Sequence, residues 1–239
     1  VTGAGSGIGE AVARRLLAEG ARVYAADLSR GAAPDGYRPV PLDVREEEDW
    51  ALAMAMVLET AGRLDVLVNS VGISAASPIA ETTLEQSREV MSTNLDGAFL
   101  ATKHGIRAMG TGGGVIIHLG SASGIRPAGG AAAYSTSKAG LRMLVRTAAK
   151  ECRDAGLEIR VNLVSPAGVK TPMWSSMPFF QALVREHGSE EAAYAALSAG
   201  GGGRFLEPDA VARVVVFLAG DDARHITGVE LPVDEGWVL

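Results

Sequence analysis

The hydrophobic pattern of the chain alternates between short apolar runs and longer amphipathic segments. The apolar runs, rich in valine, isoleucine and leucine, are typical of strands buried in a parallel sheet. They occupy Arg22–Ala26, Pro39–Leu42, Leu64–Asn69, Val115–Leu119, Ile159–Val164 and Glu230–Val233. Segments with helical spacing separate them, such as Glu10–Glu19 before Gly20, and Pro208–Ala219. This alternation predicts an α/β fold in which helices flank a parallel sheet.

The alternation continues through residues 1–239 without a proline- or serine-rich linker, which predicts a single domain. The pattern changes only between Pro172 and Arg204, where two methionines and three aromatic residues gather before Gly200–Gly203. Long irregular segments in compact domains are often lids over binding sites. We therefore expect a substrate lid at 172–204, with a loosely packed surface segment as the alternative.

Composition narrows the classes of function. The 239 residues are 47% hydrophobic and 21% charged, as in globular proteins, and the net charge of −6 does not favour a nucleic-acid partner. The apolar runs are too short to span a membrane. Cys152 is the only cysteine, which fits a reducing cytoplasm, and the four histidines lack the spacing of metal ligands.

The first residues form a glycine-rich loop, with glycines at positions 3, 7 and 9, followed by an amphipathic helix. Such a loop lets the backbone approach a diphosphate, whose charge the free N–H groups of the helix start favour. Only Val1 precedes the loop, although a central strand should lead into it. We therefore expect that the chain omits several N-terminal residues.

Asp27 directly follows the expected strand Arg22–Ala26. Its distance from the glycine-rich loop is close to that at which an acidic residue binds the ribose hydroxyls of NAD. A carboxylate about 4 Å from the 2′-phosphate of NADP would be repelled by about 4 kcal/mol at an effective dielectric of roughly 20, so Asp27 favours NAD. Two alternatives remain open. Arg30 could accommodate the phosphate of NADP, and Asp27 could form a turn or helix cap before Ser29.

Further polar residues follow the other strands. Asp43 could reach the adenine amino group or cap the helix that starts near Glu46. The turn Asn69–Gly72 would lie against the adenosine ribose, and Thr171 could bond the nicotinamide carboxamide. Asn94, within an apolar helix, needs polar partners, so it marks either a kink with a trapped water or a bridge between helices.

The stretch His118–Gly140 combines a strand end, a glycine-rich loop and a helix that carries Tyr134 and Lys138. Residues four apart share a helix face, with Cβ atoms roughly 5–6 Å apart. A neighbouring ammonium stabilises a phenolate and lowers the pKa of the tyrosine. Ser121 ends the preceding strand, so the three side chains could converge on one substrate oxygen. The alternative is a packing tyrosine and a solvated lysine.

Together these residues resemble the short-chain dehydrogenase/reductase family over essentially the whole chain. The matching motifs are Thr2–Gly9, Asp27, Asp43-Val44, Asn69–Gly72, Asn94, Ser121, Tyr134–Lys138 and Pro166–Thr171. The resemblance implies a Rossmann-type, doubly wound parallel sheet of about seven strands with helices on both faces. It also implies a homotetramer assembled through the helices around Asn94 and Tyr134 and through the C-terminal strand. Ser70, Val71 and Ala167 depart from the family pattern.

The resemblance also assigns roles to single residues. Tyr134 would remove the hydroxyl proton, Ser121 would hold the oxygen, Lys138 would bind the nicotinamide ribose, and Asn94 would keep a water that links Lys138 to solvent. The residues expected to bind the cofactor are Gly3, Ser6, Gly7, Ile8, Gly9, Asp27, Leu28, Asp43, Val44, Asn69, Val71, Gly72, Tyr134, Lys138, Pro166, Val169 and Thr171.

The expected activity is NAD-dependent hydride transfer between a secondary alcohol and a ketone. Trp174, Phe179 and Phe180 in the lid hint at a cyclic, aromatic or steroid-like substrate. The first alternative is a 3-oxoacyl-thioester reductase that uses NADPH, against which Ser6 and Asp27 argue. A regulator that senses the dinucleotide without catalysis is the second alternative, and the intact Ser121, Tyr134 and Lys138 disfavour it.

Overall fold

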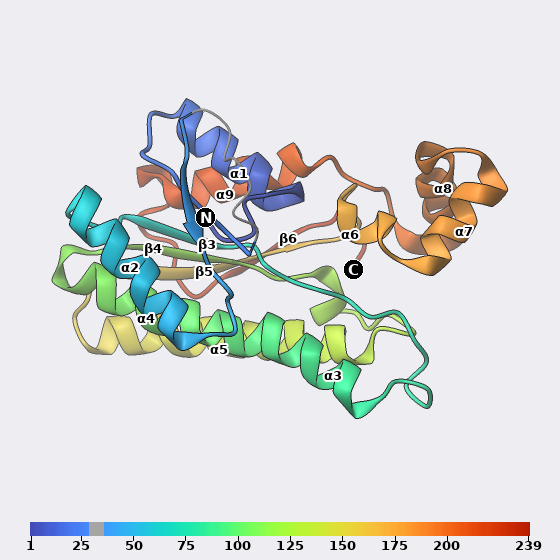
Figure 1. Cartoon of the computed structure of the whole chain (residues 1–239), viewed down its shortest axis with the longest axis horizontal. Helices are drawn as coiled ribbons and strands as arrows, with labels where there is room; N and C mark the ends of the chain where they lie inside the picture. Colours follow the sequence, from blue (N-terminus) through green and yellow to red (C-terminus); the bar gives the residue numbers. More distant parts are fainter. Residues whose placement is uncertain (29–35) are drawn as a thin grey trace.

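The computed structural model describes residues 1–28 and 36–239 of the chain (Figure 1). The strands of the described residues are β1 (Tyr24–Asp27), β2 (Arg38–Pro41), β3 (Val66–Asn69), β4 (Gly114–Leu119), β5 (Ile159–Pro166) and β6 (Glu230–Val233). The α-helices are α1 (Gly7–Ala18), α2 (Glu47–Ala61), α3 (Leu84–Met91), α4 (Gly97–Met109), α5 (Ala132–Asp154), α6 (Pro172–Ser175), α7 (Pro178–His187), α8 (Glu190–Leu197) and α9 (Pro208–Ala219). Short helical turns include η1 (Ser92–Asp96), η3 (Ala122–Gly124) and η4 (Ser198–Gly202).

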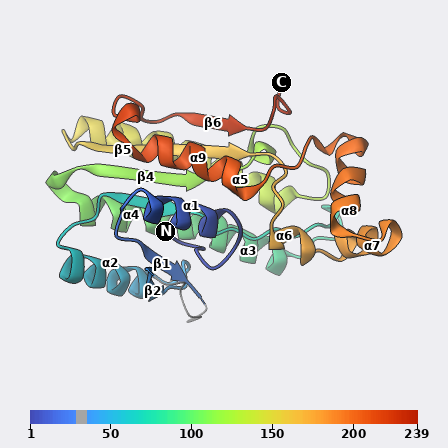
Figure 2. The ribbon, with the colours of Figure 1, turned by 90° about the horizontal axis from the view of Figure 1, so that it is seen from above.

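All strand pairs are parallel, as the apolar runs predict. β1 pairs with β2, and β3, β4, β5 and β6 follow one another in a second group (Figure 2). Thr2 joins the two groups, because it forms parallel bridges to Ala26 on one side and to Asn69 on the other. The resulting order is that of a doubly wound, Rossmann-type sheet, with Thr2 in the central position.

Helices cover both faces of the sheet. α1 and α9 lie on one face, and α2, α4 and α5 lie on the other (Figure 1). Each face has its own apolar core: Val12 of α1 and Val215 of α9 belong to one, and Trp50 of α2 and Leu141 of α5 to the other. The α/β fold class expected from the sequence is therefore confirmed. No helix among the described residues is long and apolar enough to cross a membrane.

A cavity of about 340 Å³ lies beside Thr2, and Val23, Leu42 and Leu67 are among the residues that line it. It lies between the two groups of strands that Thr2 joins. The expectation that further residues precede Val1 stays a prediction.

The segment 172–204 forms a small helical unit of its own beyond the end of the sheet (Figure 2). Its helices α6, α7 and α8 enclose a separate apolar cluster in which Phe180 is fully buried and packs against Tyr194, with ring centroids 4.6 Å apart. Val169 and Leu206, on the two stems of the segment, form a parallel bridge. The apolar side chains of the segment thus pack into a cluster of their own, and its role as a lid stays a prediction.

Candidate active site

The predicted site residues gather at one edge of the sheet. Because β1, β3, β4 and β5 run parallel, their carboxyl ends lie on the same side, which is where α/β proteins bind ligands. Asp27 and Asn69 are the last residues of β1 and β3, and Ser121 follows β4 by two residues. The expectation that these motifs meet at the strand ends is therefore consistent with the topology.

The glycine-rich loop has the backbone that a dinucleotide requires. Gly3 and Gly7 have φ values of +65° and +58°, which glycine adopts without strain. A Cβ on Gly9 would lie 2.1 Å from the carbonyl oxygen of Gly3, so only glycine fits there. α1 begins at Gly7, with Ser6 as its N-cap and Ile8 packed against the core. The helix start thus presents its free N–H groups beside the loop, which fits a diphosphate.

Asp27 is tied directly to this loop. Its Oδ2 accepts a hydrogen bond of 3.0 Å from the backbone N–H of Gly5. A Cβ on Gly5 would lie 2.8 Å from the same oxygen, so glycine allows this approach. Leu28, the next residue, is exposed. Arg30 and Ser29, which carry the two alternatives for Asp27, lie outside the described residues.

Asp43 does not cap α2. Its carboxylate instead binds Arg45, accepting from the backbone N–H at 3.0 Å and from the guanidinium Nε at 2.9 Å, and this pairing lowers the pKa of Asp43. The predicted start of the helix near Glu46 is confirmed, since α2 begins at Glu47. Val44 is buried, and its carbonyl accepts a hydrogen bond of 3.0 Å from the indole of Trp50.

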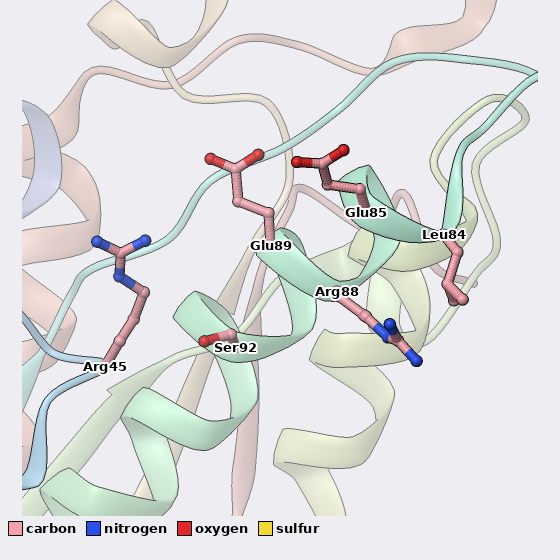
Figure 3. A pocket seen from close by; sticks show the side chains of 6 residues that line it. All are labelled: Arg45, Leu84, Glu85, Arg88, Glu89 and Ser92. Carbon is pink, nitrogen blue, oxygen red and sulfur yellow. The ribbon is translucent and has the colours of Figure 1, made fainter.

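A hollow of about 530 Å³ lies beside Arg45 (Figure 3). Its lining residues are Arg45, Leu84, Glu85, Arg88, Glu89 and Ser92. Ser121, Tyr134 and Lys138 are not among these described lining residues. Its charged lining is also poorly suited to an uncharged alcohol, so we do not assign the reaction to it.

Asn69 has a structural role that the sequence did not indicate. Its side chain, 4% exposed, accepts a hydrogen bond of 2.8 Å from Thr2 and bonds to His118 at 3.3 Å. His118 in turn bonds to Thr102 at 3.0 Å. Burial, with a smaller contribution from the charge of Lys138, lowers the pKa of His118 to about 3, so the ring is neutral at physiological pH.

This buried chain joins the central position of the sheet to α4. The signal that could have revealed it is a histidine in the middle of the apolar run Val115–Leu119, where a polar group needs a partner. The side chain of Asn69 therefore holds the sheet, and the expected contact of this residue with the cofactor stays a prediction. The turn that follows does approach the glycine loop, since a Cβ on Gly3 would lie 3.3 Å from the side chain of Val71.

Ser121, Tyr134 and Lys138 do come together. Lys138 is 4% exposed, its Nζ lies 5.7 Å from the ring centroid of Tyr134, and it donates a hydrogen bond of 2.8 Å to the carbonyl oxygen of Leu119. Tyr134 is partly buried and has a side-chain hydrogen bond with Ser121. The burial of Lys138 contradicts the alternative of a solvated lysine.

The pKa of Tyr134 differs from the expectation. Burial raises it, and the hydrogen bond with Ser121 lowers it by less, so the net direction is upward. The main cause is burial of the phenol itself. Lys138 is also buried, which lowers the pKa of its own ammonium from 10.5 to about 8. Its Nζ is also directed to the carbonyl oxygen of Leu119 at the end of β4. The predicted lowering of the tyrosine pKa by the lysine is therefore wrong for this structure.

Asn94 lies in the π-helical turn η1 between α3 and α4 and bonds to Ser137 of α5, so the expected bridge between helices is present. Its Oδ1 accepts from the N–H of Ile73 at 2.8 Å, and its Nδ2 donates to the carbonyl of Ile73 at 2.9 Å and to Ser137 at 3.1 Å. A Cβ on Gly72 would lie 3.3 Å from Nζ of Lys138 and 3.5 Å from Oδ1 of Asn94. Gly72 thus leaves room for both side chains.

The segment after β5 returns to the glycine loop. Pro166 ends β5, and Val169 is buried in the bridge to Leu206. Thr171 is the N-cap of α6, and a Cβ on Gly7 would lie 3.2 Å from its methyl group. Thr171 therefore lies beside the helix start that would hold the diphosphate, on the stem of the segment 172–204.

The chain is similar in sequence to known proteins along nearly its whole length. A family model described as enoyl-(acyl carrier protein) reductase matches residues 3–238. A 3-beta-hydroxysteroid dehydrogenase of Comamonas testosteroni is 37% identical, with 98% of this chain and 92% of that protein covered. An NADP-dependent (R)-specific alcohol dehydrogenase of Lentilactobacillus kefiri is 32% identical, with 99% and 94% covered.

Solved structures of other proteins have the same fold as the chain. The ligand-free aldohexose dehydrogenase of Thermoplasma acidophilum has a TM-score of 0.88 at 29% identity, with 99% of this chain and 92% of that chain covered. The 3-ketoacyl-(acyl-carrier-protein) reductase of Brucella melitensis, complexed with NADH, has a TM-score of 0.84 at 28% identity, with 100% and 96% covered. The chain belongs to the short-chain dehydrogenase/reductase family and is an oxidoreductase of alcohols and ketones.

Proposed function

We propose that the chain interconverts a secondary alcohol and a ketone with NAD as its cofactor, through Ser121, Tyr134 and Lys138. The observation that carries the proposal is the placement of these side chains at the strand ends, where Lys138 is 4% exposed and 5.7 Å from the Tyr134 ring. A buried ammonium beside a phenol is a costly arrangement, and such arrangements are concentrated at functional sites.

Each side chain has a defined task in this proposal. The bound nicotinamide supplies the site that accepts or returns the hydride. Ser121 holds the substrate oxygen with its hydroxyl. Tyr134, as the neutral phenol that its raised pKa favours, gives its Oη proton to the carbonyl oxygen during reduction, and its ionised form takes the alcohol proton during oxidation. Lys138 binds the nicotinamide ribose. Asn94 is a positioning residue, since it fixes Ile73 and Ser137 around the lysine.

NAD is favoured over NADP because of Asp27. Its carboxylate faces the glycine loop through the N–H of Gly5 at 3.0 Å, where the adenosine ribose would bind. The relatives include an NADP-dependent alcohol dehydrogenase, so the preference must be measured. Repulsion of about 4 kcal/mol corresponds to a preference for NAD over NADP as large as about a thousandfold. In a binding titration, Asp27→Ala should lose most of this preference. Equal binding of NAD and NADP by the unaltered protein would refute the assignment.

We further propose that 172–204 is a lid over the substrate. The compact cluster around Phe180 and its position beyond the strand ends support this role. Phe180 is fully buried within the cluster, so it does not report on the substrate, whereas Phe179 is 39% exposed. The 3-beta-hydroxysteroid dehydrogenase among the relatives supports a cyclic or steroid alcohol.

A 3-oxoacyl-thioester reductase that uses NADPH is the second candidate, supported by the likeness to the 3-ketoacyl-(acyl-carrier-protein) reductase of Brucella melitensis. A panel of steroid, cyclic, aromatic and polyol alcohols with NAD, assayed beside an acetoacetyl thioester with NADPH, separates the two. Oxidation of a cyclic or steroid alcohol with NAD is the result we expect. Reduction of the thioester alone would establish the second candidate.

We also propose a homotetramer in a reducing compartment such as the cytoplasm. Apolar side chains on the outer helices support self-association: Phe99 of α4 is 53% exposed and Met143 of α5 is 62% exposed. Cys152 is buried and forms no disulfide within the described residues. Light scattering after size-exclusion chromatography would measure the assembly, and a monomeric mass would refute it.

A further inference from the structure

The C-terminal turn that follows β6, residues 234–238, has a tightly defined backbone. Asp234 accepts hydrogen bonds of 3.0 Å from the N–H groups of Gly236 and Val238, one on each carboxylate oxygen. Glu235 has a φ of 50°, a left-handed conformation that costs about 1–3 kcal/mol in a residue other than glycine. Such strain persists only where the surroundings hold it. This turn presents Trp237 in one fixed direction.

Trp237 contacts residues 201–204, which lead from the end of the segment 172–204 to Leu206 and are called its second stem. Its indole Nε1 donates a hydrogen bond of 3.2 Å to the carbonyl oxygen of Gly201. Gly203 lies against the indole, and a Cβ there would approach the ring to 2.8 Å. Gly203 also has a φ of +74°, so its backbone suits glycine as well. Arg204, the next residue, lies 3.5 Å from Glu235 of the turn.

Trp237 also contacts the loop that carries Ser121. Arg126 donates a hydrogen bond of 2.8 Å to the carbonyl oxygen of Trp237, and its guanidinium lies 5.0 Å from the centroid of the indole. The backbone of Arg126 is itself bonded to Ala122 at 2.9 Å, directly after Ser121. One tryptophan therefore joins the stem of the segment to the loop that holds the reacting oxygen.

We propose that Trp237 is a positioning residue for the reaction: it couples the second stem of the lid to the Ser121 loop and thereby sets how the lid closes over the substrate. This inference rests on the proposed role of 172–204 as a lid. The two stems are joined to each other at their base, because Val169 pairs with Leu206 and Lys170 lies 2.9 Å from Glu207. Beyond that base, the contacts of Trp237 and Glu235 tie residues 201–204 to the C-terminal turn.

Trp237→Phe is the informative variant. It removes the indole N–H but keeps an aromatic ring for Arg126 and the backbone carbonyl that Arg126 binds. The loss of one hydrogen bond should raise the KM for the alcohol about two- to tenfold. The dissociation constant of NAD should not change, because Asp27 and the glycine loop lie elsewhere. Phe217→Leu is the matched control: it alters an aromatic residue on α9 that is 44% exposed, and should leave KM unchanged.

Limited trypsin digestion provides a readout that does not depend on activity. Arg204, whose side chain is 77% exposed, adjoins the second stem, and Arg63, whose side chain is 68% exposed, lies after α2. In Trp237→Phe, cleavage after Arg204 should accelerate at least about twofold relative to cleavage after Arg63. A general loss of stability would accelerate both cuts together.

The two readouts separate this inference from the proposed function. A raised KM with selective cleavage after Arg204 supports the coupling, and selective cleavage supports the link to the stem even if the unaltered protein oxidises no alcohol in the panel. Failure of the panel would instead count against the proposed function. An unchanged KM in an active Trp237→Phe variant, unchanged cleavage, or equal acceleration at both arginines would overturn the role of Trp237.

Discussion

Lys138 makes the stability of the protein depend on pH in a calculable way. Burial lowers the pKa of its ammonium from 10.5 to about 8 in the folded protein, while the unfolded chain restores the ordinary value. Between these two values the unfolded state binds the extra proton, so the free energy of unfolding rises with pH. Below about pH 8 the full penalty of roughly 3 kcal/mol is present, and above pH 10.5 it is gone.

Lys138→Met removes this ionisation and keeps a side chain of similar length. From about pH 7.5 to about pH 10, the free energy of unfolding of the unaltered protein should rise by roughly 2 kcal/mol relative to the variant. The variant also loses the hydrogen bond to the carbonyl oxygen of Leu119. That loss lowers the free energy of unfolding of the variant by the same amount at every pH, so the slope of the free energy of unfolding against pH does not change.

Urea unfolding followed by circular dichroism, at constant ionic strength, measures this difference at each pH. Lys150→Met is the matched control, because Lys150 lies on the same helix with a side chain that is 66% exposed. Its curve should run parallel to that of the unaltered protein. Parallel curves for Lys138→Met and the unaltered protein would refute the reasoning.

Two further changes test the site and its support. Gly9→Ala places a Cβ 2.1 Å from the carbonyl oxygen of Gly3, so calorimetry should show NAD binding weakened at least about tenfold. Gly112→Ala is the control, because a Cβ there meets open space. Equal affinities of the two variants for NAD would contradict the role of the glycine loop. Glu230, whose side chain is 8% exposed, pairs with Arg142, so Glu230→Gln should lower the free energy of unfolding by about 1–3 kcal/mol in urea. A loss below about 0.5 kcal/mol would show that the pair is not stabilising.

Local patterns were enough to predict most of the elements. The bounds Pro208–Ala219 and Glu230–Val233 coincide with α9 and β6, because a proline at the first helical position and a short apolar run are strong local signals. β5 extends two residues beyond its expected end. Ser165 and Pro166 pair with β6 across the sheet, and this pairing is not visible in the local sequence.

The parts of the site that depend only on residue spacing or on steric need could be predicted from the sequence. Tyr134 and Lys138 lie one helical turn apart by geometry, and the glycines of the first loop meet a steric need. Properties that depend on the folded environment of a side chain could not be predicted in this way. The direction of the Tyr134 pKa depends on burial, and the contact of Arg126 with Trp237 joins residues 111 positions apart. Such contacts arise only from tertiary packing.

The turnover of Tyr134→Phe tests the central claim most directly. The measurement is the rate of NADH formation with an alcohol that the unaltered protein oxidises, alongside calorimetric binding of NAD. Removing the hydroxyl beside Ser121 should lower the turnover at least about a hundredfold, because a positioned acid–base group contributes about 10²- to 10⁴-fold, while the affinity for NAD is retained. Turnover close to that of the unaltered protein would contradict the account.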